Sequence, residues 1–308
     1  MASGTRRVIA IALAANLAIA AAKFVAAAVT GSSGLLSEAF HSVADSANEA
    51  LLGVASVRGE RPPDLHHPFG HGREAYFWSL IAAVAVFVGG SLLALQEGIK
   101  ELLKSTPVSS FVAGYVVLAV AFALDGTSLR QAYKQLKSEA AELGRDFGSH
   151  LGMTSDPITR AVFLEDTAAL AGSTVAAIGL ALRQLTHSAV PDAAAAIVIA
   201  LILAFVAVQL AGRNRDFLVG EQASERLRRS VTEVIAGQPG IVAINELLVT
   251  FVGPRRVWVV ARVDIADALR GDQVEALVRD TEKALLDLSE VIVRADIVTV
   301  GRINAAGD

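Results

Sequence analysis

The chain has 308 residues, of which 53% are hydrophobic and only 19% are charged, and its mean hydropathy is +0.51. This composition is more apolar and less charged than that of ordinary soluble domains, so it predicts a membrane protein. The net charge of -4 argues against nucleic-acid binding, and the absence of cysteine excludes a disulfide framework and a thiolate metal site.

Six apolar segments follow one another along the chain, at residues 8–30, 34–57, 76–95, 108–129, 158–182 and 191–212. Each has roughly the 20 residues needed to cross a hydrocarbon core about 30 Å thick. The first is interpreted as a retained span, because it exceeds the length of a signal-peptide core and lacks a convincing cleavage site. We therefore expect an α-helical transmembrane domain of six helices over residues 1–215.

Basic residues near the span ends predict the orientation of this domain. An even number of spans puts both termini on one side, and a cytoplasmic N-terminus leaves chiefly Lys100, Lys104 and Arg183 outside. The basic residues that then lie in the cytoplasm are Arg6, Arg7, Arg58, Arg61, Arg73, Arg130, Lys134, Lys137, Arg145, Arg160, Arg213 and Arg215. Short loops and Ala-rich spans favour a bacterial inner (plasma) membrane.

Charged side chains form a stripe in the second apolar segment. Glu38, His41 and Asp45 are spaced i, i+3 and i+7, which places them on one face of a helix. Ionised groups inside a membrane are costly and usually mark an ion pathway or a pair. His41 and Asp45 lie one turn apart, so they can hold a divalent ion of the Zn²⁺ type.

The fifth apolar segment adds Glu165 and Asp166 within "FLEDTAAL". Lys23 is the only Lys or Arg deep in a predicted span, and one lysine cannot neutralise Asp45, Glu165 and Asp166 together. A cation that is not part of the chain is therefore implied.

A second candidate metal site lies before the third span, in "RPPDLHHPFGHGREAYFW". Asp64, His67 and His71 have helical spacing, but Pro68, Gly70 and Gly72 favour a loop. Three histidines in six positions beside an aspartate favour a metal-binding loop over a solvated connector.

After the last span the composition becomes polar. Residues 221–238 predict a helix, 241–252 and 257–265 two strands, 272–288 an amphipathic helix and 291–300 a third strand. We expect a cytoplasmic α/β domain of order αββαβ over residues 216–308. Between the fourth and fifth spans, residues 128–143 predict a surface helix, and "FGSHLGMTSDP" predicts a loop.

These features together resemble the cation diffusion facilitator family of metal/proton antiporters. The six spans and α/β tail, "SEAFHSVAD", "HPFGHGR" and an acidic fifth span carry the resemblance, and "TSDPITRAVFLEDTAAL" and "RNRDFLVGE" are similar to the zinc transporter nine-like branch. The resemblance implies a transporter, not an enzyme, that exports divalent cations from the cytoplasm in exchange for protons. It also implies a homodimer joined by a metallochaperone-like, ferredoxin-like C-terminal domain.

In that family, paired residues of the second and fifth spans hold the transported ion. His41 and Asp45 match the first pair and Asp166 matches part of the second, but the remaining position is Val162. Glu165 is a candidate replacement, yet consecutive helical residues point about 100° apart, so it requires a rotated or distorted helix.

The loop and the tail compare differently with the family. Asp64, His67 and His71 match the family's secondary cytoplasmic site. Positions at which relatives carry tail ligands are Asn245, Ala261 and Arg294 here, so we expect no binuclear site in the tail.

The identity of the cargo and two rival functions stay open. The donor set favours Zn²⁺ and allows Mn²⁺, Fe²⁺, Co²⁺ or Cd²⁺. An intramembrane metalloenzyme would bury similar residues, but the sequence lacks an HExxH helix. The alternative of a membrane metal-sensing or scaffold protein that binds metal without transport would not need Asp45 and Asp166 in the bilayer.

Overall fold

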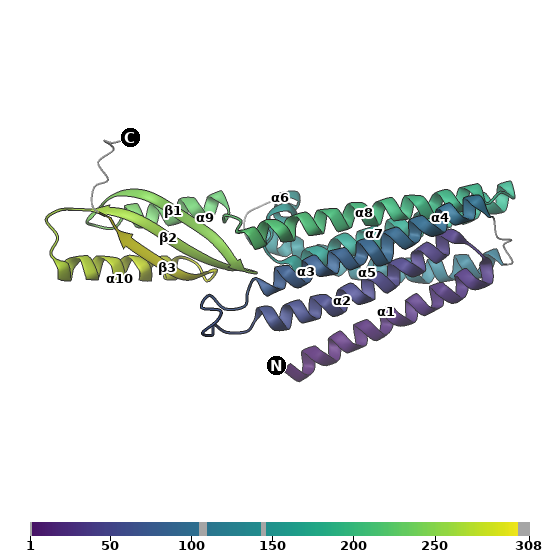
Figure 1. The fold of residues 1–308 in the computed structure, drawn as a ribbon, viewed down its shortest axis with the longest axis horizontal. Coiled ribbons are helices and arrows are strands. Elements are labelled where there is room, and N and C mark those ends of the chain that lie inside the picture. Colours follow the sequence, from purple (N-terminus) through teal and green to yellow (C-terminus); the bar gives the residue numbers. More distant parts are fainter. Residues whose placement is uncertain (1, 105–109, 143–145, 301–308) are drawn as a thin grey trace. The chain divides into compact units, whose positions relative to one another are not determined.

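The fold is that of a computed structural model (Figure 1). It describes the backbone of residues 2–104, 110–142 and 146–300, and the side chains of residues 16–104, 110–141 and 146–300. The chain divides into two compact units, Met1–Arg58 with Glu74–Arg215 and Gly59–Arg73 with Asp216–Asp308. Residues 59–73, which hold the expected metal-binding loop within the predicted domain of residues 1–215, thus group with the C-terminal unit.

The first unit is a bundle of long helices that run side by side (Figure 1). Its helices are α1 (Ala2–Thr30), α2 (Ser33–Gly59), α3 (Glu74–Ala85), η1 (Val86–Leu92), α4 (Leu93–Leu103), α5 (Phe111–Glu142), α6 (Phe147–Met153), α7 (Pro157–Thr186) and α8 (Val190–Val219). The third predicted span is thus one uninterrupted helix, in which the π-helical segment η1 connects α3 to α4.

Within the described residues, four helical stretches are long and apolar enough to cross a membrane: Glu74–Leu103, Phe111–Ala141, Pro157–Thr186 and Val190–Val219. The described part of α1 contributes a shorter apolar helix, Asn16–Thr30. Helix α2 is outside this set and carries Glu38, Asp45 and Glu49. The structure therefore confirms a helical membrane architecture but not the expected count of six spans.

The two expectations between the fourth and fifth spans have different outcomes. The helix expected from residue 128 onward is present as far as Glu142, as the continuation of α5 without a break, because no proline interrupts it. The expected loop contains α6, whose first turn is capped by Asp146: its carboxylate accepts a hydrogen bond from the Ser149 amide at 2.8 Å.

Small residues allow close helix packing in this bundle. A β-carbon added at Gly98 would lie 2.7 Å from Ile197 Cγ1 and 3.0 Å from the Ala193 carbonyl oxygen, so α4 and α8 require glycine there. Buried alanines surround the larger residues of the core, Leu35, Leu180, Ile199 and Leu203. This pattern is expected where helices associate by close van der Waals packing.

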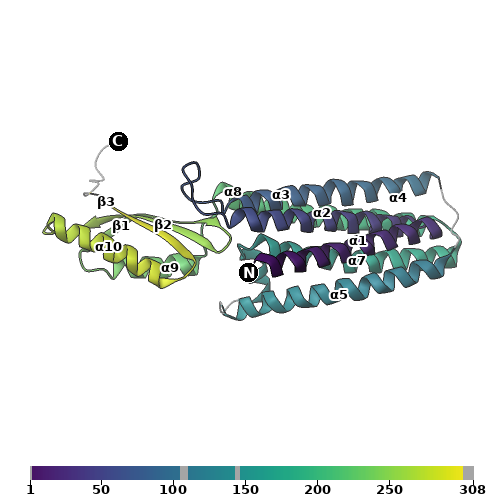
Figure 2. The same ribbon diagram turned by 90° about the horizontal axis from the view of Figure 1, so that it is seen from below.

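The second unit is a three-stranded sheet with two helices packed on one face (Figure 2). Its elements are α9 (Glu225–Ala236), β1 (Ile241–Gly253), β2 (Arg256–Ile265), α10 (Gly271–Leu288) and β3 (Ile292–Thr299). Strand β2 is central, antiparallel to β1 and parallel to β3. The expected order αββαβ is confirmed.

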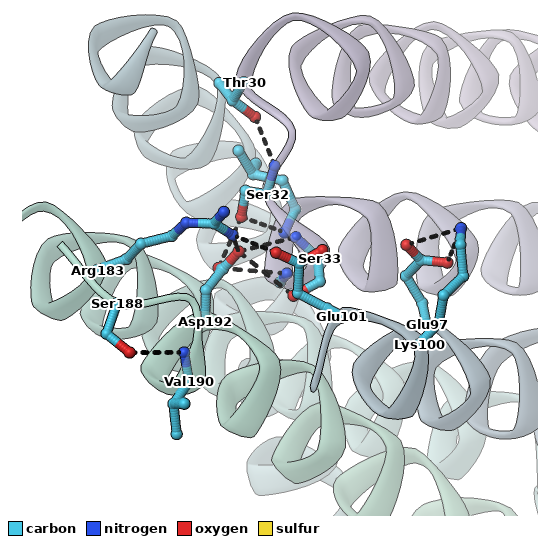
Figure 3. Close-up of polar contacts among 12 residues, drawn as sticks. Thr30, Ser32, Ser33, Glu97, Lys100, Glu101, Arg183, Ser188, Val190 and Asp192 are labelled. Carbon is cyan, nitrogen blue, oxygen red and sulfur yellow. Dashed lines mark hydrogen bonds and ion pairs between the residues drawn. The ribbon is translucent and has the colours of Figure 1, made fainter. Parts of the chain in front are cut away.

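A buried charge cluster joins four helices at the end of the bundle that holds the α1–α2 and α7–α8 turns (Figure 3). Arg183 of α7 lies 2.9 Å from Glu101 of α4 and 3.0 Å from Asp192 of α8. Asp192 also accepts hydrogen bonds from the Ser32 hydroxyl at 2.7 Å and the Ser33 amide at 2.8 Å. Its carboxylate therefore caps the first turn of α2 from a different helix.

We expect Asp192→Ala to destabilise the bundle by about 3–5 kcal/mol, because it removes one of the two buried carboxylates that pair with Arg183 and leaves the first turn of α2 without its acceptor. The free energy of unfolding in detergent, from a denaturant titration, checks this. The matched control is Lys100→Gln, which removes the exposed Lys100–Glu97 pair (3.1 Å) and should cost less than about 1 kcal/mol. Equal losses in the two variants would contradict the role given to Asp192.

Candidate metal sites

His41 and Asp45 of α2 form the first part of the membrane site. Their closest atoms, His41 Nε2 and Asp45 Oδ2, are 3.3 Å apart, and His41 is only 1% exposed. Within the described structure, neither His41 nitrogen makes a hydrogen bond, and Asp45 Oδ1 makes none either. Buried polar atoms without partners are unusual in folded proteins, and an absent ligand is one of their explanations.

Glu38, the third member of the predicted stripe, has a different partner. Its Oε2 lies 3.0 Å from Lys23 Nζ of α1 and accepts a hydrogen bond from the Ser173 hydroxyl at 3.1 Å. A β-carbon at Gly172 of α7 would collide with the Glu38 carboxylate, so glycine makes room for it. Lys23 is therefore paired with Glu38, which lies on the same helix face as His41 and Asp45.

A cavity of about 330 Å³ lies between α1, α2, α5 and α7, and Asp45 lines it. His41 is not among its described lining residues. Among the described residues that line it, none is Lys, Arg or His. Its lining includes the carboxylates of Asp45, Glu49, Asp125, Glu165 and Asp166. The cavity is thus a negatively charged space inside an apolar bundle.

Neutral side chains hold three of these carboxylates. The Asn16 amide donates to Glu49 Oε2 at 2.8 Å, and the Asn48 amide donates to Glu165 Oε2 at 2.5 Å. The Ser128 hydroxyl donates to Asp166 Oδ2 at 2.6 Å. None of these donors carries a charge, so they orient the carboxylates without neutralising them.

Both acidic residues of α7 reach the cavity. They line it together with Val162 and Ala169. Counted from Val162 as i, Glu165 is i+3, Asp166 is i+4 and Ala169 is i+7, so the four residues form one helical stripe. Helix α7 is a regular α-helix over this stretch. Both residues therefore line one cavity from a regular helix, and their joint ligation of one ion stays a prediction.

The structure does not bring the membrane residues into one coordination shell. In the described part of the chain, one set of three or more His, Asp or Glu side chains has all its ligand atoms within 4.8 Å of one another, and it is the loop set. His41 and Asp45 are together, whereas Glu165 and Asp166 stand across the cavity with their own hydrogen-bond donors.

Sequence analysis missed several residues of this cavity. Asn48 and Glu49 follow Asp45 at i+3 and i+4, so the helical stripe could have been continued to them. Asp125 is the one charged residue of the fourth apolar segment, a signal that was available in the sequence. The donors Asn16 and Ser128 have no distinctive sequence pattern.

The loop site is compact. His67 Nδ1 lies 3.1 Å from Asp64 Oδ1, and His71 Nε2 lies 3.0 Å from Asp64 Oδ2. The backbone amides of His66 and His67 also donate to Asp64 Oδ1, at 2.8 and 2.7 Å. Two imidazoles and a carboxylate in this arrangement suit Zn²⁺, with a position left for water or a further ligand.

Hydrogen bonds keep Asp64 ionised. The contact with the His71 ring, followed by the amide of His67, lowers the pKa of the Asp64 carboxyl below its usual range. A lowered pKa means that these contacts stabilise the loop above the ordinary aspartate pKa and lose that effect only as the pH falls well below it. The Asp64 carboxylate therefore stays ionised, and able to bind a metal ion, at mildly acidic pH.

Aromatic stacking holds the loop of residues 59–73 against strand β2 of the same unit. The rings of Phe69 and Trp258 are 4.6 Å apart, and the Arg294 guanidinium lies 5.5 Å from each ring centroid. Asp296 accepts hydrogen bonds from both Trp258 and Arg294. Gly72 permits this approach, because a β-carbon there would lie 2.9 Å from the Cα of Gly253.

Comparison with known proteins gives a family match and several relatives. Residues 9–219 match the model of the cation efflux transmembrane domain. The chain is 31% identical over 242 residues to the human mitochondrial proton-coupled zinc antiporter SLC30A9, covering 79% of this chain and 43% of that protein.

Two further relatives differ in their named cargo. Metal tolerance protein C4 of Arabidopsis thaliana is 31% identical over 84% of this chain and 57% of its own length. Manganese efflux system protein MneP of Bacillus subtilis is 27% identical over 75% of this chain and 74% of its own. The chain thus spans about half the length of the human and plant relatives.

We expect Zn²⁺ binding at the loop to shift Trp258 emission to shorter wavelength, because a bound ion would hold Phe69 against the indole ring. The measurement uses the purified full-length Trp78→Phe variant, in which Trp258 is the remaining tryptophan of two. The same titration of a His67→Ala/His71→Ala variant is the control. An identical spectral response in that variant would show that the signal does not come from the loop.

We also expect Asp64→Asn to weaken Zn²⁺ binding at the loop while keeping its decline at acidic pH. The weakening follows from the lost carboxylate charge, and the unchanged pH dependence follows because the remaining histidines must still be deprotonated. Equilibrium Zn²⁺ titrations of the full chain at pH 5 to 8 check this. Loss of the pH dependence in Asp64→Asn would contradict the assignment.

Proposed function

Because the chain belongs to the cation efflux family, we propose that it exports divalent metal cations, with Zn²⁺ as the preferred cargo, in exchange for protons. The match over residues 9–219 confirms the resemblance to the cation diffusion facilitator family. That family consists of integral membrane transporters, so the chain is not an enzyme.

The negatively charged cavity is the observation that supports transport most strongly. Its five lining carboxylates are Asp45, Glu49, Asp125, Glu165 and Asp166. Several ionised carboxylates cannot share an apolar space at low cost without cations or protons to balance them. A cavity that takes up a divalent cation or protons in alternation meets this requirement.

We assign the cargo site to His41, Asp45 and Asp166, with Glu165 in place of the ligand missing at Val162. His41 and Asp45 are 3.3 Å apart, and Glu165 and Asp166 line the same cavity. A cation between α2 and α7 would draw Glu165 and Asp166 away from their present neutral partners, Asn48 and Ser128, since the Coulomb attraction exceeds that of an amide or hydroxyl donor.

Proton exchange follows from competition for the same atoms. Imidazole and carboxylate groups must be deprotonated to bind a metal ion, so ion binding releases protons and protonation expels the ion. Alternating exposure of a midplane site is the general scheme of secondary carriers. Net export then uses the proton gradient as its driving force.

Zn²⁺ is proposed as cargo because the donor set mixes one imidazole with carboxylates. The SLC30A9 relative is named as a zinc antiporter and MneP as a manganese efflux protein. Mn²⁺, Fe²⁺, Co²⁺ and Cd²⁺ are the alternatives.

Orientation and assembly are also proposals. The bias of Lys and Arg favours cytoplasmic termini, in a bacterial inner membrane. A homodimer through the C-terminal unit is supported by apolar side chains exposed on its strands, among them Val242, Leu248 and Val298.

We expect Zn²⁺ flux into proteoliposomes under a pH gradient, and its loss in Asp45→Asn and Asp166→Asn. Each substitution removes a charge from the cavity while preserving side-chain shape, so at least about a tenfold fall in flux is expected for a direct ligand. Thr167→Val is the matched control, because Thr167 follows Asp166 but is exposed and bonds the Phe163 carbonyl of its own helix.

The outcomes separate transport from its rival. Wild-type flux with loss in both Asn variants supports the antiporter. Metal binding by the wild-type protein without flux of any of the five ions would overturn transport and favour the membrane metal-sensing or scaffold protein.

The fourth ligand has its own test. We expect Glu165→Gln to raise the KM for Zn²⁺ by about tenfold or more, since it removes a carboxylate charge while keeping a group that Asn48 can bond. Flux measured as a function of Zn²⁺ concentration gives the KM. An unchanged KM would remove Glu165 from the site.

A further inference from the structure

Asp125 of α5 lies at the cavity although it belongs to neither of the two helices that carry the expected ligands. It lines the cavity together with Asp45 and Asp166. We propose that Asp125 is a ligand of the transported cation, and that its carboxylate shifts the site's preference toward ions that favour oxygen. This inference rests on the proposed function, because it concerns the same cargo.

The face of α5 that carries Asp125 is in direct contact with α7. Ser128, one turn after Asp125, donates its hydroxyl to Asp166 Oδ2 at 2.6 Å. Residues three apart on a helix share a face, so Asp125 points to the same side as Ser128. The hydrogen bond between Ser128 and Asp166 thus fixes α5 in a position from which Asp125 can reach an ion held by Asp166.

The Oδ2 atom of Asp125 is buried and has no hydrogen-bond partner within the described part of the chain. Glu49, Glu165 and Asp166 each accept a hydrogen bond from a neutral donor at the same cavity. A carboxylate with a purely structural role would be expected to have a donor of this kind.

Lys23 does not serve as the counter-charge of Asp125. Its ammonium group lies 3.0 Å from Glu38 Oε2 and forms an ion pair with that residue. Asp125 lines the same cavity as the carboxylates of Asp45 and Asp166. The local charge around Asp125 therefore remains negative.

Other unpartnered oxygens point to a ligand at the same place. Glu165 is only 6% exposed, lines the cavity, and its Oε1 atom has no hydrogen bond. Asp45 Oδ1 is likewise buried and without a donor. Helices α2, α5 and α7 thus each present a carboxylate oxygen without a hydrogen-bond donor at one cavity, which is the arrangement that a cation would satisfy.

A third carboxylate would change the chemistry of the site. Carboxylate oxygen suits hard ions such as Mn²⁺, whereas imidazole suits Zn²⁺ and softer ions. Removing Asp125 should therefore weaken binding of Mn²⁺ more than binding of Cd²⁺. A merely structural role would affect both ions alike.

The experiment measures Mn²⁺, Zn²⁺ and Cd²⁺ affinities of the purified full chain together with flux in proteoliposomes. All variants carry His67→Ala and His71→Ala, so that the loop cluster does not contribute to binding. The variants are Asp125→Asn, Asp125→His and the control Thr127→Val, which changes an exposed α5 residue two positions from Asp125.

We expect Asp125→Asn to weaken Mn²⁺ binding on the order of tenfold, with a smaller loss for Cd²⁺. Asp125→His should recover Zn²⁺ and Cd²⁺ binding but not Mn²⁺ binding. That recovery would also show that the variant is folded.

Equal affinities and ion preference in Asp125→Asn and Thr127→Val would overturn the inference, as would equal weakening for all three ions with no recovery in Asp125→His. An unchanged affinity combined with altered proton coupling would overturn it in favour of a proton-only role. Absence of flux in the parent protein would instead overturn the proposed function, and the binding comparison would still decide whether Asp125 is a ligand.

Discussion

The cost of burying charge in an apolar bundle is the constraint on which the rest of this structure depends. The bundle meets it in two ways away from the cavity. Lys23 pairs with Glu38 between α1 and α2, and Arg183 pairs with Glu101 and Asp192 near the α1–α2 and α7–α8 turns. In both places the opposite charges come from different helices, so each ion pair neutralises buried charge and also holds two helices together.

The cavity is the place where this balance is incomplete. Its carboxylates are oriented by Asn16, Asn48 and Ser128, which donate hydrogen bonds but carry no charge. Such donors fix geometry and leave the negative charge for a mobile cation or for protons. The donors therefore orient the carboxylates without neutralising them. A metal ion and protons could then balance the same negative charge in turn, because no lysine or arginine is among the described residues that line the cavity.

The loop cluster follows a different design. The ligand atoms of Asp64, His67 and His71 already lie within 4.8 Å of one another, in a segment held by the stacking of Phe69 on Trp258. A preassembled cluster near water can bind an ion without moving helices, whereas the residues of the cavity must converge. The geometry of the loop cluster thus suits stable binding of an ion. The geometry of the cavity suits binding followed by release.

The sequence by itself determined the membrane class, the αββαβ order of the tail and the residue types of both sites, because hydrophobic periodicity and His/Asp spacing are local properties. Sequence could not show that Glu38 is paired with Lys23, that Gly59–Arg73 groups with the sheet, or that Asp192 caps α2. Nor could it place Asp125 beside Asp166, since those residues lie on different helices. These facts were decided by tertiary structure, because which buried charges face one another depends on how separate helices pack and not on spacing along any one of them.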